Sequence, residues 1–316
     1  MHRPLFFLLG LHLSSTFASI IGPVITANFP DPSVVQVEDG DWYAFATNNG
    51  VYNVQIATSH DFENWTVLNQ DALPNAGAWS DGTNVWAPDV REIDNTFVMY
   101  YAATIANGST HCVGAATSKT VTGPYTPQDS PIACPVSQGG AIDPSGFVDT
   151  TGERWLVYKI DGNSLGHGGN CNNGIPPLTN TPILLQRMSS DGLTPIGSPT
   201  KILDRGDEDG PLVEAPSLVK VNGMYVLFYS RNCYAGPWYV VAHATSKSIT
   251  GPYTKARNPD ISTGFGPTGM LYAPGGMTVT ADGKRMVFHA DLGTDVNTRQ
   301  MYIAYLDIIG DGQVIV

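Results

Sequence analysis

Three acidic side chains stand at matched positions along this 316-residue chain. Asp31 and Asp143 each precede a proline in a copy of Asp-Pro-Ser, and Glu214 lies one residue further from the proline in Glu-Ala-Pro-Ser. Hydrolysis of a glycosidic bond uses one protonated carboxyl group, which protonates the leaving oxygen, and one ionised carboxylate, which activates water or attacks the anomeric carbon. A third acid can separate the pKa values of these two groups. The three acids therefore predict glycoside hydrolysis, if the fold brings them together.

The prolines beside these acids belong to a repeat that runs through the chain. Five prolines start apolar runs at spacings of 56, 56, 72 and 58 residues: Pro32, Pro88, Pro144, Pro216 and Pro274. Segments 116–126 and 244–254 also match closely, from Ala-Thr-Ser-Lys to Gly-Pro-Tyr-Thr. Each unit has runs and turns for four strands, so the five units predict an all-β, five-bladed β-propeller. The alternative, two unrelated β-sandwiches, leaves the phased prolines unexplained.

The residues before these prolines are predicted to meet at one end of a central channel. The first strand of each propeller blade lines that channel. The five positions hold Asp31, Ala87, Asp143, Ala215 and Ala273. A single Asp-Pro is common at turns, but two Asp-Pro-Ser copies in matched phase, with a Glu one residue off in blade four, are more specific than turn chemistry. Clustered like charges cost stability unless they serve a function, so these acids are predicted to form an axial active site.

Aromatic side chains suited to stacking on sugar rings accompany the acids. Phe29 and Trp86 abut the channel positions and are predicted to bind substrate. Trp42 lies inside a strand-like run and is predicted to be a core residue. Trp238 is a further aromatic candidate, with core packing as the alternative.

Several of these motifs resemble the blade-start motifs of glycoside hydrolase family 43. They are Asn28-Phe-Pro-Asp-Pro-Ser33, Trp86-Ala-Pro-Asp89, Ala141-Ile-Asp-Pro-Ser145 and Val213-Glu-Ala-Pro-Ser217. The resemblance extends over residues 22–312 and implies a five-bladed propeller that inverts anomeric configuration. It implies Asp31 as the general base, Asp143 as the acid that tunes pKa and orients, and Glu214 as the general acid. Inversion implies roughly 6.5–9.5 Å between the carboxyl groups of base and acid, which leaves room for water.

Two further residues take roles from the same resemblance. His289 resembles the fifth-blade histidine that lines the channel near a bound cation in several members, with a core histidine as the alternative. Arg299 resembles the arginine that reaches the substrate, with a surface arginine as the alternative. No cofactor is expected to be required, although a structural Ca²⁺ or other cation could lie in the channel. Pro30 stands where the family's endo-arabinanases more often carry His, which favours exo-acting arabinofuranosidases and xylosidases.

Composition and the N-terminus exclude several classes of protein. The net charge of −12, from 16 basic and 28 acidic residues, argues against general nucleic-acid binding, which needs a basic surface. No later segment reaches the roughly 18 apolar residues of a membrane span. Residues 1–18 have a basic start, an apolar run and small residues, which is typical of a secretory signal peptide. Residues 19–316 are then a single catalytic domain.

Secretion would place the four cysteines in an oxidising compartment, where three pairings are possible. Cys112–Cys134 and Cys171–Cys233 are favoured, mainly because adjacent blades would bring the second pair together. Cys171 lies in the Gly-, Asn- and Pro-rich segment 163–181, which is predicted to be one long loop over a face of the propeller. Asn64 and Asn107 are N-glycosylation acceptors if the host is eukaryotic.

Together these features predict a secreted, inverting glycoside hydrolase that acts on arabinose- or xylose-containing plant polysaccharide. α-L-Arabinofuranosidase activity is favoured, with β-xylosidase and endo-1,5-α-L-arabinanase as alternatives on the same fold. The expected partners are arabinan, arabinoxylan and their oligosaccharides, with neither nucleic acid nor membrane, and a monomer is expected. An alternative of another class is a glycan-binding propeller lectin, which would not need acids in only three of five blades.

Overall fold

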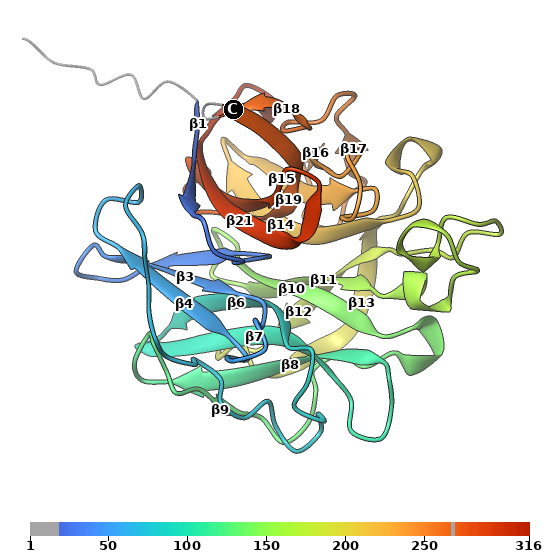
Figure 1. Ribbon diagram of the computed structural model, residues 1–316. Helices are drawn as coiled ribbons and strands as arrows, with labels where there is room; N and C mark the ends of the chain where they lie inside the picture. The colour runs from blue at the N-terminus through green and yellow to red at the C-terminus, as the bar shows by residue number, and fades with distance from the viewer. Residues whose placement is uncertain (1–18, 267–268) are drawn as a thin grey trace, which may run out of the picture.

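The computed structural model describes residues 19–266 and 269–316, so the predicted signal peptide lies outside the described residues. Within these ranges the chain is nearly all-β, and its antiparallel sheets are arranged as the five blades of a propeller (Figure 1). The predicted fold class is therefore confirmed. No helix in the described ranges is long and apolar enough to cross a membrane.

Blades one to four each contain four consecutive strands, hydrogen-bonded in chain order. Blade one has β2 (Ser33–Gln36), β3 (Trp42–Ala46), β4 (Gln55–Ser59) and β5 (Thr66–Val67). Blade two has β6 (Trp86–Ile93), β7 (Thr96–Thr104), β8 (His111–Ser118) and β9 (Thr126–Pro127). Blade three has β10 (Ala141–Val148), β11 (Arg154–Ile160), β12 (Ile183–Met188) and β13 (Pro195–Leu203). Blade four has β14 (Val213–Val221), β15 (Met224–Arg231), β16 (Val240–Ser246) and β17 (Thr254–Lys255).

Blade five is completed by the N-terminal strand. Its sheet has the order β1-β21-β20-β19-β18. These strands are β1 (Ser19–Ile25), β18 (Gly264–Gly266), β19 (Gly269–Val279), β20 (Arg285–Leu292) and β21 (Asp295–Tyr305). β1 runs antiparallel to β21, with Ser19 opposite Tyr305. The repeat predicted five units in chain order and did not indicate that a strand from the other end of the chain supplies the outer edge of the last one.

Short elements fill the connections between these strands. A terminal hairpin of β22 (Asp307–Ile309) and β23 (Gln313–Ile315) follows blade five. Single turns of 3-10 helix occur in loops of blades two to four: η1 (Val136–Gln138), η2 (Gly162–Leu165), η3 (Asn170–Asn172) and η4 (Asp207–Asp209). Both η2 and η3 lie in the long connection between β11 and β12, so the segment 163–181 is a loop with two helical turns.

The residue before each phased proline has the same unusual backbone. The φ angles are 52° at Asp31, 45° at Ala87, 55° at Asp143, 50° at Ala215 and 48° at Ala273. A left-handed conformation is strained for a residue with a Cβ atom and is disfavoured before proline. In four blades the innermost strand also shifts its register against the next strand at this point. The repeat therefore sets the left-handed residue in all five blades and a bulge in four of them, at the end of the channel that carries the acids.

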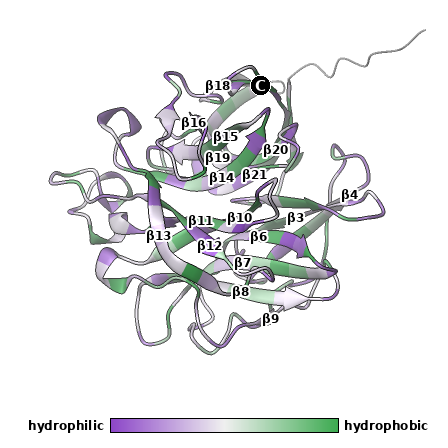
Figure 2. Cartoon of the chain, turned by 180° about the vertical axis from the view of Figure 1, so that it is seen from behind, coloured by the Kyte–Doolittle hydropathy of each residue, from purple (hydrophilic) through white to green (hydrophobic). Residues whose placement is uncertain are grey.

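Hydrophobic clusters between adjacent blades hold the ring together. One joins blades one and two and includes Phe45, Val90 and Tyr101. Another joins blades one and five and includes Val34, Trp42 and Val287. In Figure 2 the strands carry much of the hydrophobic colour, while the loops are largely hydrophilic. Charged residues make up only 14% of the chain, and this low share follows from the architecture, because most strands are covered by neighbouring sheets.

Both predicted disulfides are present. Cys112–Cys134 closes a loop of blade two, and Cys171–Cys233 joins the long loop of blade three to the β15–β16 loop of blade four. The second bond confirms that adjacent blades bring these two cysteines together. It fastens the long loop at its middle.

Candidate active site

The three acids lie at one end of the central channel. Asp31 lies two residues before β2 of blade one, Asp143 lies in β10 and Glu214 lies in β14. Asp31 and Asp143 line a narrow cavity of about 20 Å³, together with Ala87 and Ala215 from the bulges of two other blades. The charges of Glu214 and Asp31 both act on Asp143. The structure thus brings the three sequence-predicted acids together.

Asp31 is held as an ionised carboxylate. Its Oδ1 accepts a hydrogen bond from Nη1 of Arg299 at 3.1 Å, and its Oδ2 accepts one from Oγ1 of Thr47 at 2.7 Å. Burial alone would raise the pKa of Asp31, but the Arg299 charge, with the Thr47 hydrogen bond, outweighs burial and lowers that pKa. Arg299 therefore lies in the site, as predicted from its resemblance. Its contact with substrate stays a prediction.

Thr47 links the first two blades at this position. Besides donating to Asp31, its Oγ1 accepts a hydrogen bond from the backbone N–H of Ala87 at 2.9 Å. Sequence analysis did not identify Thr47, because it is a single hydroxyl residue at the end of the apolar run Trp42–Ala46. It fixes the carboxylate of Asp31 against the neighbouring bulge.

His289 supports Asp31 from the fifth blade. Its Nδ1 accepts a hydrogen bond from the backbone N–H of Asp31 at 3.0 Å, so in the neutral ring Nε2 carries the proton. Burial, with the nearby Arg299 charge, lowers the pKa of His289 to about 3, so the ring is neutral near pH 7. The ring stacks on Tyr239, with 6.0 Å between ring centroids.

The surroundings of His289 do not fit direct ligation of a cation. Nε2 carries the proton, and it finds no hydrogen-bond partner among the described residues. Within residues 19–266 and 269–316, no group of three or more His, Cys, Asp and Glu side chains is arranged to hold a metal ion. We therefore assign no chemical step to a metal at this position.

Asp143 and Glu214 form a partly buried acid pair on neighbouring blades. Burial, and then the charge of Glu214, raise the pKa of Asp143 to about 8. Lys159 opposes this effect, as does the backbone N–H of Ala215, which donates to Oδ2 of Asp143 at 2.9 Å. The pair therefore retains a proton near neutral pH, while Asp31 is ionised.

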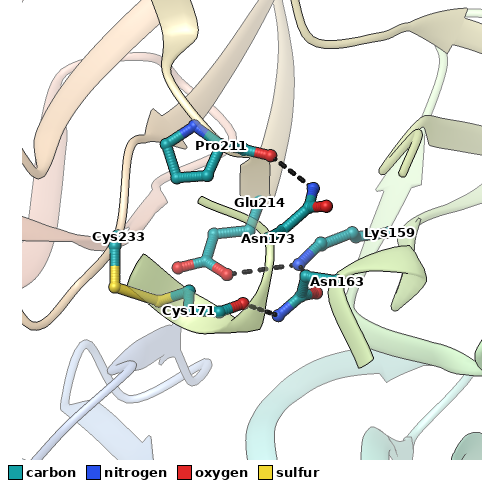
Figure 3. Close-up of a disulfide and its surroundings, with 7 residues drawn as sticks. All are labelled: Lys159, Asn163, Cys171, Asn173, Pro211, Glu214 and Cys233. Carbon is teal, nitrogen blue, oxygen red and sulfur yellow. Dashed lines mark hydrogen bonds and ion pairs between the residues drawn. A yellow bond between two sulfur atoms is a disulfide. The ribbon is translucent and has the colours of Figure 1, made fainter. Parts of the chain in front are cut away.

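A buried lysine lies beside Glu214. Nζ of Lys159 is 3.4 Å from Oε2 of Glu214, and the lysine side chain is completely buried. The same Nζ donates to Oδ1 of Asn163 at 2.7 Å, and Nδ2 of Asn163 donates to the carbonyl oxygen of Cys171 at 3.4 Å (Figure 3). This chain of contacts connects Glu214 to the disulfide Cys171–Cys233. Sequence analysis missed Lys159, because one lysine at the end of an apolar strand reads as a surface residue.

A further acid lies close to this pair. Asp161 directly precedes η2, and burial raises its pKa to about 6, with the charge of Glu214 acting in the same direction and Lys159 opposing it. Its position in the long loop, outside the phased prolines, gave no sequence signal. It adds negative charge to the Glu214 side of the site.

The aromatic predictions have different outcomes. Trp86 is partly exposed at the start of β6 and stacks on His111, with 3.8 Å between ring centroids, so it can still meet a substrate. Phe29 is completely buried in the cluster between blades one and five, which corrects its predicted contact with substrate: a ring without accessible surface cannot stack on a sugar. Trp42 belongs to the same cluster, as predicted. Trp238 is 75% exposed.

A second charged pair lies deeper in the channel. Asp89 follows the blade-two bulge and is held by Arg91 through two contacts of 2.8 Å. Asp89 also accepts a hydrogen bond from the backbone N–H of Gly146 at 2.8 Å, which joins blade two to blade three. Because both carboxylate oxygens are engaged, this pair reads as a structural connection rather than a source of protons.

A larger cavity, of about 540 Å³, lies at the opposite end of the channel. It is lined by residues at the far ends of the innermost strands, including Ile93, Val148 and Val279. None of the three acids lines it. The larger cavity is therefore separate from the candidate active site at the three acids.

Comparison with known proteins agrees with this geometry. A model of glycosyl hydrolases family 43 matches residues 20–314. The chain is 28% identical over 276 residues to the extracellular endo-α-(1→5)-L-arabinanase 1 of Bacillus subtilis, covering 82% of this chain and 79% of that protein. It is 26% identical over 253 residues to the extracellular exo-α-(1→5)-L-arabinofuranosidase ArbA of Cellvibrio japonicus, covering 73% and 68%. A crystal structure of a thermostable family-43 glycoside hydrolase superposes with a TM-score of 0.78 at 26% identity, covering 95% of this chain and 96% of that chain.

Proposed function

The chain belongs to glycoside hydrolase family 43, and from that premise we propose that it hydrolyses α-L-arabinofuranosidic bonds of arabinan. The observation that carries the proposal is the difference in protonation across the site. Asp31 is held ionised by Arg299, while the Asp143–Glu214 pair retains a proton. One base and one acid in a single pocket are what hydrolysis with inversion requires.

The proposed reaction is a single displacement. Asp31 takes a proton from water, and the oxygen of that water attacks the anomeric carbon. The bond from that carbon to the leaving oxygen breaks, and Glu214 gives its proton to that oxygen. Asp143 keeps the proton available to Glu214 through their shared buried site. Asp31 then releases its proton to solvent and Glu214 takes one up, so the cycle needs no cofactor.

Arabinan is proposed as the substrate because of the named relatives. One relative is named for endo action on (1→5)-linked arabinan and another for exo action. We favour endo action, since the endo-acting relative is more similar and covers more of this chain. The exo-acting arabinofuranosidase is the second candidate, favoured by Pro30 in front of Asp31.

Secretion is proposed with this activity. The leader-like residues 1–18, the two disulfides and the extracellular relatives support it. Polymeric arabinan would meet the enzyme outside the cell.

A substrate panel tests the proposal. Linear arabinan, aryl α-L-arabinofuranoside and aryl β-D-xyloside are incubated with the protein, and products are followed by chromatography and NMR. Endo action gives oligosaccharides first, and exo action gives arabinose alone. Release from the xyloside only would move the substrate to xylose, and binding without release would favour a lectin. Retention of configuration in the first product would exclude the proposed displacement.

Two substitutions test the residue roles. Asp31→Asn should lower kcat by about 10²–10⁴-fold for every substrate, because no base remains to take the proton from water. Glu214→Gln should lower kcat strongly for arabinan but little for a dinitrophenyl glycoside, whose leaving group needs no proton. Asp311→Asn and Glu38→Gln, both exposed, are matched controls and should leave both rates unchanged. Equal losses on both substrates for Glu214→Gln would remove the general-acid assignment.

A further inference from the structure

Two aromatic side chains stand exposed on one loop beside the site. Trp238 is 75% exposed and Tyr234 is 40% exposed, and both belong to the loop between β15 and β16. Each ring presents a flat apolar face together with one polar group, which is a form of side chain suited to contact with a ligand.

The loop that carries them is fixed at several points. Cys233 forms the disulfide with Cys171 of blade three. The carbonyl oxygen of Pro237 accepts a hydrogen bond from Oγ1 of Thr263 at 2.7 Å. The backbone N–H of Asn232 donates to the carbonyl oxygen of Asp209 at 2.9 Å. A loop held in this way presents its side chains in one arrangement, which lowers the entropic cost of binding.

This loop spans both sides of the acid group. Tyr234 lies over Arg299, with 5.2 Å from the guanidinium carbon to the ring centroid, and Arg299 in turn holds Asp31. The disulfide at the start of the loop has Glu214 in its surroundings (Figure 3). Tyr234 thus lies on the side of the base, and the disulfide lies on the side of the acid.

A cavity of about 300 Å³ lies at the disulfide, which has Glu214 in its surroundings. It is walled by both loops: Gly169, Asn170, Cys171, Asn232, Cys233, Ala235, Gly236 and Trp238. An aromatic face for the C–H face of a sugar, with two asparagine amides for its hydroxyl groups, is the lining expected of a carbohydrate site.

We propose that this cavity binds the sugar unit on the leaving-group side of the scissile bond, with Trp238 as its stacking platform. The inference rests on the proposed function, in which Glu214 protonates the leaving oxygen. The leaving sugar must therefore pass Glu214, on the side away from the water that Asp31 activates. The ligand is an arabinofuranose unit of an arabinan chain. The disulfide lines the subsite and holds the long loop of blade three at a fixed separation from the β15–β16 loop of blade four.

Kinetics on two substrates test this subsite. Arabinotetraose has sugar units on the leaving-group side, whereas α-L-arabinofuranosyl fluoride releases a single atom and cannot use the subsite. Trp238→Ala should raise KM for arabinotetraose by about tenfold and leave kcat/KM for the fluoride unchanged. Trp238→Phe should restore most of the loss. Ile315→Ala, which shortens an exposed apolar side chain on β23, is the control and should change neither.

The disulfide is tested with the double variant Cys171→Ser, Cys233→Ser. It should raise KM for arabinotetraose in the same direction as Trp238→Ala and preserve turnover of the fluoride. Thermal unfolding monitors whether the fold survives. Equal effects of Trp238→Ala on both substrates, or no effect on either, would overturn the subsite.

Binding separates this inference from the proposed function. Calorimetry with arabinotetraose on Asp31→Asn, with and without Trp238→Ala, measures the subsite without turnover. Weaker binding in the Trp238→Ala protein supports the subsite, whether or not the wild-type chain cleaves any substrate of the panel. If the wild-type chain cleaves none of them, the proposed function alone is overturned. Equal affinity in both proteins overturns the subsite alone, and no binding in either overturns both.

Discussion

Asp143 destabilises the folded state and, by the same environment, retains a proton in the candidate site. It lies in a partly buried bulge next to Glu214, where its ionised form is disfavoured by lost solvation and by a like charge. The same environment keeps a proton in the site at the pH where Asp31 is ionised. In the proposed mechanism, the burial that weakens the folded state is therefore the source of the acid that the reaction needs.

The pH dependence of activity follows from this pair. With the pKa of Asp143 raised to about 8, kcat/KM should fall above pH 8 as the pair loses its proton. The lowered pKa of Asp31 should extend activity below the usual range of a carboxylate base. Asp143→Asn removes the neighbouring charge, so the basic limb should move to lower pH, while Asp311→Asn should not move it. A pH–rate profile from pH 4 to 10 measures both limbs, and an unmoved basic limb in Asp143→Asn would contradict the assignment.

The raised pKa of Asp143 should also make the stability of the folded protein depend on pH in a defined direction. The folded protein holds a proton on Asp143 up to about pH 8, whereas the unfolded chain loses it near the ordinary aspartate pKa of about 3.9. The folded state thus binds more protons between these values, so this group makes the protein less stable as pH rises from 4 to 8. Asp143→Asn should therefore raise Tm at pH 8 more than at pH 5. Equal changes in Tm at both pH values would show that Asp143 is not buried as described.

Sequence alone could predict the acids but not their supports. Asp31 and Asp143 directly precede phased prolines and Glu214 lies two residues before one, and this pattern is visible in a single sequence. Lys159 and Asn163 reach the site through side-chain contacts between an apolar strand and an irregular loop, which no spacing encodes. The prediction that Phe29 contacts substrate was wrong for a related reason. Its neighbours in sequence lie in the site, but its ring packs in the hydrophobic cluster between blades one and five.

At the scale of the strand, the left-handed residue before each phased proline sets the positions of the acids. The same φ occurs where the residue is alanine, so the bulge belongs to the repeat and not to the catalytic side chains. Holding an alanine in this conformation costs about 1–2 kcal/mol. A proline follows this conformation in every blade. Aspartates occupy two of the five equivalent places, and Glu214 lies one residue before a third.

Replacing one of these alanines by glycine tests the strain. Ala87→Gly relieves the left-handed conformation but loses about 0.4–1 kcal/mol through the greater freedom of the unfolded chain. The free energy of unfolding should stay unchanged or rise by up to about 1 kcal/mol. The matched change Ala44→Gly, in the fully buried interior of β3, should lower it by about 1–2 kcal/mol. Denaturant unfolding measures both, and equal destabilisation would argue against strain at position 87.

At the scale of the whole molecule, the ring is closed by pairing of chain ends. β1 covers the edge of β21, and Ile25 enters the cluster that also holds Val34 and Val287. The repeat predicted five blades correctly, because each has its own proline and turns. It could not predict the closure, because β1 lies outside the repeat and resembles any short apolar segment.

Removing the closing strand should destabilise the ring. A chain that begins at Thr26 lacks β1, whereas a chain that begins at Ser19 retains it. The free energy of unfolding of the shorter chain should be lower by at least about 3 kcal/mol, because losing a buried isoleucine such as Ile25 alone costs about 2–5 kcal/mol. A chain that ends at Gly310 removes a similar length from the other end, including the largely exposed β23, and should lose less. Denaturant unfolding of the three chains compares them, and the opposite order would contradict closure by β1.

The pairing of β1 with β21 also sets an order of events during synthesis. The strand that is made first must wait for a partner that is made last, because Ser19 lies opposite Tyr305. Until then both strands offer unpaired backbone edges, which are sites of aggregation. Four blades can fold while the chain is still being extended, but the fifth cannot. The yield of this enzyme from a producing cell should therefore depend on how well aggregation through β1 is prevented until blade five has been synthesised.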